Sequence, residues 1–201
     1  LARFGDVAGA ETELRSAAIM DPTKPEIPYQ LALLKYKLQD YDAALALVGE
    51  SLRKLEQEKV EFQAKFAAAE AKLKEAREQA IASTGGAATG NVPEIHLPPK
   101  PDKKFPFAHL LYAKILFEQE QYTNALEQVQ IFIDQEPSSP LGYIQQAYIY
   151  EKSGDASKSY NAFKSAIEAW QAKVKNGNRK NYFQTHSSEK KDLEKIGTLC
   201  S

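Results

Sequence analysis

Apolar and small residues recur every three to four positions along most of this chain, with charged and amide side chains between them. This spacing places the apolar positions on one face of a helix. Asp21-Pro22 and Glu136-Pro137 interrupt the pattern, because proline has no main-chain donor for a helix interior. An all-α chain is expected. The pattern predicts helices over residues 7–20, 26–38, 41–82, 107–118, 122–135, 140–152 and 156–175, and a short last helix from Ser187.

The helical segments return at a regular interval of about 34 residues, a period that is typical of stacked helical hairpins. Ala10 and Ala44 are separated by this interval, as are Ala125 and Ser159. Ala44 and Ala125 are farther apart, by one such interval plus a long additional stretch. We therefore expect a helical-hairpin solenoid that is interrupted by one long insertion.

The insertion begins with an unusually long helix. Between Asp42 and Ala82 the chain has no proline and one glycine, and strong helix formers dominate. A helix of roughly 40 residues is about 60 Å long. Apolar residues also repeat every seven positions, with Lys59 as an interruption, which predicts a projecting helix with a coiled-coil-like seam. The seam residues are Leu52, Leu55, Phe62, Phe66 and Leu73.

A proline-rich segment follows the long helix. Residues 84–106 hold five prolines, and such segments extend by about 3.1 Å per residue, enough to return along the helix. Two arrangements stay open: Ile95 and Leu97 lie on the seam, or the segment is a disordered linker. The expected regions are repeats over 1–55 (the first one partial), an insertion over 56–105 made of the helix 56–83 and the extended segment 84–105, two repeats over 106–175, and a tail with a capping helix over 176–201.

Small residues stand where the two helices of each hairpin would cross, and Tyr41 and Tyr122 follow the turns. A small side chain lets two helices approach to roughly 8–9 Å. Together with the closing Asp21-Pro22 and Glu136-Pro137, these features resemble tetratricopeptide repeats. The first repeat lacks its first helix, so the sequence reads as a piece of a longer protein. The crossing positions are Ala10, Ala17, Ala32, Ala44, Ala113, Ala125, Ala147 and Ala166.

The resemblance implies a protein partner in the concave groove that the first helix of each hairpin lines. The groove positions are mostly aromatic and aliphatic, and the chain lacks the Lys/Arg/Asn cluster with which some family members clamp an acidic C-terminus. An apolar or aromatic segment is therefore the expected partner. In the alternative, neighbouring helices or the insertion bury these side chains. The positions are Tyr29, Leu33, Tyr36, Lys37, Leu110, Lys114, Phe117, Ile144, Tyr148 and Glu151.

Composition argues against several other functions. The net charge is −1, so nothing in it favours nucleic acid, and no apolar run is long enough to span a membrane. His96, His109 and His186 are far apart and have no second metal ligand at the usual spacing. No phosphate-binding loop or nucleophile motif is present, so no cofactor, metal or catalytic residue is expected. The lone Cys200 excludes an intrachain disulfide and leaves the cytosol and the periplasm both open.

Two functions follow from these patterns. The first is a non-catalytic scaffold or adaptor that binds a partner segment in the groove. The second is a structural assembly subunit of a larger complex, joined through the long helix by self-association or by insertion. An exposed apolar stripe on such a helix usually has a partner.

Overall fold

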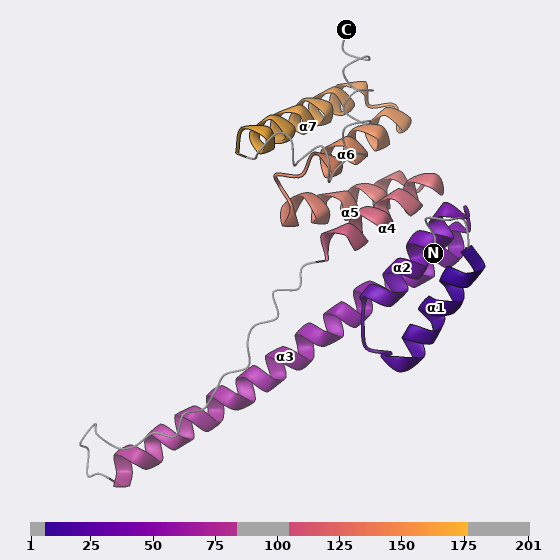
Figure 1. Cartoon of the computed structure of the whole chain (residues 1–201). Coiled ribbons are helices and arrows are strands. Elements are labelled where there is room, and N and C mark those ends of the chain that lie inside the picture. Colours follow the sequence, from indigo (N-terminus) through magenta and orange to yellow (C-terminus); the bar gives the residue numbers. More distant parts are fainter. Residues whose placement is uncertain (1–6, 84–104, 177–201) are drawn as a thin grey trace. The chain divides into compact units, whose positions relative to one another are not determined.

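The computed structural model describes residues 7–83 and 105–176, and in these ranges it contains seven helices and no strand (Figure 1). Every predicted helix in these ranges is present, with ends within two residues of the prediction. The last helix from Ser187 and the proline-rich segment lie outside the described residues. The helices are α1 (Val7–Met20), α2 (Glu26–Lys37), α3 (Tyr41–Ser83), α4 (Pro106–Glu118), α5 (Tyr122–Gln135), α6 (Pro140–Lys152) and α7 (Ala156–Asn176).

The chain divides into two compact units. The first is drawn from residues 1–52 and 104–201, and the second from residues 53–103. Helix α3 begins in the first unit and ends in the second. The other six helices belong to the first unit.

Within the first unit the helices pack as consecutive hairpins. Helices α4 and α5 form one hairpin and α6 and α7 form the next, while the contacts of α1 with α2 and of α5 with α6 join successive repeats. The first helices of successive hairpins contact one another as well, α2 with α4 and α4 with α6. Alanines at the predicted crossing positions are completely buried, which permits this close approach. They are Ala32, Ala44, Ala113, Ala125, Ala147 and Ala166.

The turns inside the hairpins share one backbone geometry. Gln39, Glu120 and Gly154 each have a positive φ, of 61°, 61° and 86°. At each turn the main-chain nitrogen of this residue bonds a carbonyl three residues back, and the next nitrogen bonds one five residues back. This is the Schellman arrangement that ends a helix. The turns at Glu120 and Gly154 are one repeat period apart, so the backbone recurs at the interval predicted for the alanines.

Two hydrophobic clusters form most of the core. One joins Ala32, Ala44 and Val48 to α4, and the other joins α4 to α5 and α6 around Phe132, which is completely buried. Leu45 packs against both clusters. The start of α3 is therefore the second helix of a hairpin with α2, as the repeat period requires.

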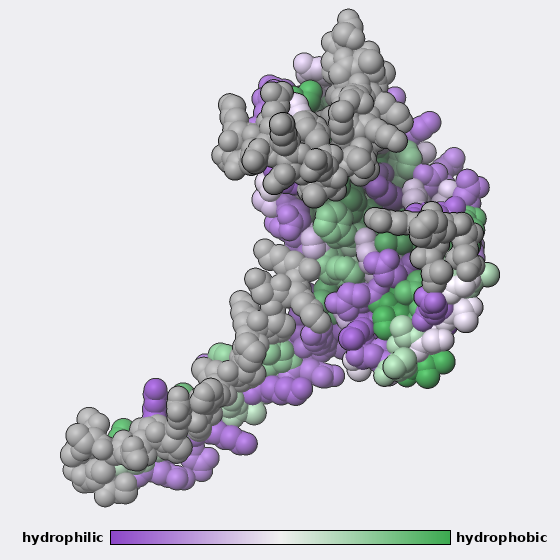
Figure 2. Space-filling view, in the orientation of Figure 1, coloured by the Kyte–Doolittle hydropathy of each residue, from purple (hydrophilic) through white to green (hydrophobic). Residues whose placement is uncertain are grey.

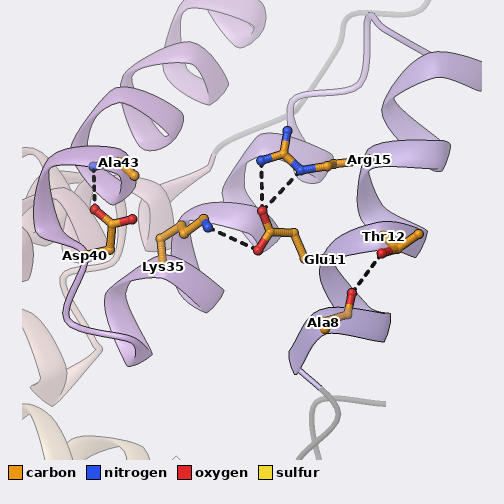
Figure 3. A network of polar contacts seen from close by, with 7 residues as sticks. All are labelled: Ala8, Glu11, Thr12, Arg15, Lys35, Asp40 and Ala43. Atoms are coloured by element: carbon orange, nitrogen blue, oxygen red, sulfur yellow. Dashed lines mark hydrogen bonds and ion pairs between the residues drawn. The ribbon is translucent and has the colours of Figure 1, made fainter.

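A polar network links α1 to α2 (Figure 3). Lys35 Nζ lies 3.0 Å from Glu11 Oε2, and Arg15 donates to Glu11 Oε1 at 2.8 Å. The Arg15 hydrogen bond, and after it the Lys35 hydrogen bond, lower the pKa of Glu11 below its ordinary value. Both cations favour the charged carboxylate over the protonated form.

In the second unit, α3 presents the predicted seven-residue pattern. Phe62, Phe66 and Leu73 are half-buried, and the residues directly beside each of them are exposed. The Phe62 and Phe66 ring centroids are 5.8 Å apart. Figure 2 shows many hydrophilic side chains on the visible face of this stretch, with hydrophobic ones among them. Leu52, by contrast, packs against the cluster of α2, α3 and α4 in the first unit, so the predicted seam is not one continuous free stripe.

Candidate functional site

The first unit contains a pocket of about 230 Å³ that three successive first helices line. Helix α2 contributes one side chain, α4 contributes three and α6 contributes four. Five of these eight residues belong to the predicted groove set. The lining residues are Tyr36, Lys114, Phe117, Glu118, Leu141, Ile144, Gln145 and Tyr148.

Helical spacing explains this grouping. Leu141, Ile144, Gln145 and Tyr148 follow one another at intervals of three, one and three residues, which places them along one face of α6. Lys114, with its neighbours Phe117 and Glu118 at three and four positions further on, forms the matching face of α4. Since α4 packs on α6 and on α2, these faces meet at one site.

Tyr36 forms the α2 side of the pocket. Its hydroxyl lies 3.5 Å from Glu118 Oε1, and its ring centroid is 5.8 Å from that of Tyr41. Burial, followed by the charge of Glu118, raises the pKa of Tyr36 to about 12. The phenol is therefore neutral throughout the physiological range. The long distance makes the contact with Glu118 a weak hydrogen bond.

The second helices of the hairpins support the two other aromatic walls. Phe117 packs against Tyr122 of α5, with ring centroids 6.0 Å apart. Tyr148 meets Phe163 of α7 edge to face at 5.6 Å. Aromatic pairs of this geometry contribute about 0.5–1.5 kcal/mol beyond their buried area. The walls are thus held in place by the hairpins behind them.

Lys114 and Glu118 give the pocket one charge of each sign, so its lining carries no net charge. The remaining polar groups are neutral. A strongly acidic or strongly basic ligand gains little from this balance. The lining thus combines apolar surface with neutral polar groups and one ion of each sign.

Three lining residues were not in the predicted set. They are Glu118, Leu141 and Gln145. Leu141 and Gln145 lie three residues before Ile144 and three before Tyr148, so a full helical stripe through the predicted α6 positions would have included them. Gln145 is 7% exposed, and nothing in the sequence distinguishes a buried glutamine from a solvated one.

Other predicted groove residues lie elsewhere. The prediction that Leu110 lines the groove was wrong. Leu110 is 4% exposed and belongs to the core cluster with Phe132, so it has almost no surface for a partner. Tyr29 and Leu33 pack against the cluster of α2, α3 and α4. The Tyr29 ring lies 4.8 Å from that of Phe105, and burial raises the Tyr29 pKa. Lys37 and Glu151 are exposed and outside the pocket lining.

The described residues show little sign of any other kind of site. In residues 7–83 and 105–176, no three His, Cys, Asp or Glu side chains gather in a way that could hold a metal ion. His109 Nδ1 lies 2.9 Å from Gln128 Oε1, so this histidine pairs with a neighbouring helix. None of the helices described combines the length and apolar character needed to cross a bilayer. His96, His186 and Cys200 fall outside the described ranges.

The fold is a helical-hairpin solenoid of the tetratricopeptide type, as the repeat period predicted. A solved structure of MamA from MSR-1 shares this fold with a TM-score of 0.53 at 15% sequence identity, over 85% of this chain and 71% of that one. MamA from Desulfovibrio magneticus RS-1, from residue 41 to its end, is 17% identical over 86% of this chain and 90% of that chain, with a TM-score of 0.36.

A further crystal structure of MamA is 17% identical over 87% of this chain and 94% of that chain, with a TM-score of 0.35. At these identities the likeness concerns the fold alone. No protein-family model and no curated protein matches the sequence.

Proposed function

We propose that this protein is a non-catalytic interaction scaffold that binds a segment of a partner protein in the pocket between α2, α4 and α6. The observation that carries the proposal is that side chains from three successive hairpins line one pocket. A surface built from several repeats is the usual means by which a solenoid binds an extended partner.

The chemistry of the lining favours an apolar or aromatic segment. Tyr36, Phe117 and Tyr148 present rings, and Leu141 and Ile144 supply aliphatic surface. Aromatic residues in such positions tend to dominate binding energy because they bury large areas at small entropic cost. The volume of about 230 Å³ lies below the range of typical small-molecule sites. It suits one or two side chains of a longer segment.

A display library of short peptides, selected on the whole chain, tests the proposal. Binding of the selected peptides is then measured by titration with Tyr36→Ala and Phe117→Ala. We expect each change to weaken binding about tenfold or more, as at an interface hot spot. Tyr160→Ala is the matched control, because Tyr160 is 66% exposed on α7 and outside the pocket lining.

Thermal unfolding of each variant separates lost binding from lost folding. If folded Tyr36→Ala and Phe117→Ala bind every selected peptide as well as the parent chain does, the pocket is not the binding site.

A second candidate function is a structural assembly subunit joined through α3. The half-buried row of Phe62, Phe66 and Leu73 favours it. Under this proposal the double variant Phe62→Glu and Phe66→Glu has a lower oligomeric mass in sedimentation than the parent chain, or it no longer enters the larger complex of which the protein is a subunit. The control pair is Gln63→Glu and Ala67→Glu, at exposed positions directly beside the two phenylalanines. Equal masses for both pairs and for the parent chain would exclude self-association through this row.

A further inference from the structure

Within the second unit, one face of α3 is less exposed than the opposite face. The alanines show this best, because they all have the same side chain. Those on the row of Phe62, Phe66 and Leu73 are half-buried, whereas those on the other side of the helix are exposed. The half-buried ones are Ala69, Ala76 and Ala80, and the exposed ones are Ala64, Ala67, Ala68 and Ala71. The row therefore has the burial of a packed helix face, although α3 is the only helix described in this unit.

The path of the chain brings one candidate occupant to this face. Phe105 packs against the cluster that contains Val48, and its ring lies 4.8 Å from that of Tyr29. From Val48 to Ser83, α3 is about 50 Å long at 1.5 Å per residue. The chain must cover this distance again between Ser83 and Phe105. A proline-rich segment of that length reaches roughly 65–70 Å, so it can follow α3 back to its start with little length to spare.

Phe105 also sets the register of such a return. At about 3.1 Å per residue, each residue of an extended segment passes about two residues of a helix. Counted back from Phe105, apolar residues of the segment then come within a turn of the apolar residues on the row. The pairs are Pro99 with Phe62, Leu97 with Phe66, and Ile95 with Leu73. Aromatic surfaces are what proline-rich extended segments bind.

The charges beside the row fit the same direction. Glu56 and Glu58 flank the row near the start of the second unit, and Lys72 flanks it farther out. The segment carries Glu94 in its first half and three lysines in its second half. An antiparallel return thus brings its lysines to the acidic part of α3 and Glu94 to Lys72, which favours this direction over the reverse. The three lysines are Lys100, Lys103 and Lys104.

We propose that residues 91–104 lie extended and antiparallel along α3, with Ile95 and Leu97 on the half-buried row. The occupant of the row is then the chain itself and not a second copy. This inference goes beyond the proposed function, because it does not involve the pocket. It also competes with the second candidate function, since a covered row is not free to join another chain.

Disulfide formation in the whole chain tests the placement, with Cys200 replaced by serine in every variant. One variant combines Leu97→Cys with Ala69→Cys on the row, and the matched control combines Leu97→Cys with Ala64→Cys on the exposed side. The two alanines are about equally far along the axis from the level of Leu97, so the variants differ in the helix face. In a glutathione buffer we expect the intrachain disulfide to Ala69→Cys to be favoured about tenfold over that to Ala64→Cys.

Equal disulfide formation at the two positions would overturn the proposal, because the segment would then not distinguish the faces of α3. A second copy on the row would give another result: Ala69→Cys with Leu97 intact would form covalent dimers more readily than Ala64→Cys does. That outcome would assign the row to self-association and would overturn the proposal as well. Neither result bears on the pocket, so the proposed function is tested separately.

Amide hydrogen exchange tests the packing without added cysteines. The double variant Ile95→Asp and Leu97→Asp should raise the exchange rates of α3 amides between residues 62 and 73 about tenfold, since the row loses its cover. Ala87→Asp with Ala88→Asp is the control, because it adds the same charge outside residues 91–104. It should leave these rates unchanged. Equal rates in the two double variants would contradict the placement of Ile95 and Leu97.

Discussion

Glu120 and Gly154 occupy the same left-handed backbone position in successive repeats, with φ values of 61° and 86°. Each ends the first helix of a hairpin, and each main-chain nitrogen bonds the carbonyl three residues back. An L side chain costs free energy at positive φ, whereas glycine does not. Glu120 and Gln39 therefore carry a backbone strain that Gly154 lacks.

Replacing Glu120 by glycine should stabilise the protein. We expect Glu120→Gly to raise the free energy of unfolding by about 0.5–1 kcal/mol, because relief of the left-handed strain exceeds the entropy that glycine adds to the unfolded chain. Urea unfolding measures it. Glu127→Gly, at an exposed interior position of α5, is the control and should cost about 1 kcal/mol. Two changes of the same sign would contradict the interpretation of the turn.

Gly142 is required by the close packing of α6 on α5. A Cβ at this position would lie 2.6 Å from Ile133 Cγ1 and 2.7 Å from Phe132 Cδ1, which is closer than atoms can approach. We expect Gly142→Ala to lower the unfolding free energy by about 1–3 kcal/mol through overpacking.

Gly49→Ala is the matched change, because a Cβ there would meet no heavy atom within 4 Å. It should stabilise α3 by about 1 kcal/mol. Equal effects of the two substitutions in urea unfolding would show that the contact with Phe132 is not restrictive.

The second helices of the hairpins begin with unequal caps. Asp40 accepts from the Ala43 nitrogen at 3.3 Å, and Asp155 accepts from the Lys158 nitrogen at 3.0 Å. Gln121 occupies the equivalent position before α5 and makes no such bond. Gln121→Asp should therefore stabilise the protein by about 0.5–1 kcal/mol.

Gln121→Glu separates capping from charge. It brings the same charge to the helix N-terminus, but its longer side chain fits the cap poorly. Gln121→Glu should therefore raise the free energy of unfolding by less than Gln121→Asp does. If both variants gain equally in chemical unfolding, the helix dipole and not the cap is the cause.

Glu11 should make stability depend on pH in the acidic range. Its pKa in the folded protein is below the ordinary 4.5, first because of the Arg15 hydrogen bond and then because of Lys35. A carboxyl with a lowered folded pKa stabilises the protein above its unfolded pKa, and this contribution disappears as pH falls through the folded value. Unfolding measured from neutral pH downward should show the loss.

Glu11→Gln removes this part of the pH dependence. Glu13→Gln, at an exposed position of the same helix, serves as the control. An unchanged acid profile in Glu11→Gln would mean that the ion pairs of Glu11 with Arg15 and Lys35 (Figure 3) contribute nothing to the stability of the fold.

The helices could be predicted from sequence because each ends at a strong signal, such as Asp21-Pro22 or Glu136-Pro137. The period was also readable, since alanines that are completely buried at helix crossings leave little choice of residue. The left-handed backbone at two of the turns could not be predicted, because glutamine and glutamate rarely adopt the positive φ that Gln39 and Glu120 have.

The pocket could be predicted only in part. The stripe on α6 follows from helical spacing, which identified Ile144 and Tyr148. Leu110 has the same spacing on α4, four residues before Lys114, but the N-terminal half of α4 packs into the core around Phe132. Burial on a second side of a helix depends on neighbours that are distant in sequence.

The most direct test of the proposed binding site is amide chemical-shift mapping of a selected peptide on the intact chain. We expect the largest shifts on three helices that are separate in sequence, at Tyr36 of α2, Phe117 of α4 and Tyr148 of α6. Shifts confined to α3 beyond Leu52 would contradict it and would assign partner binding to the long helix instead.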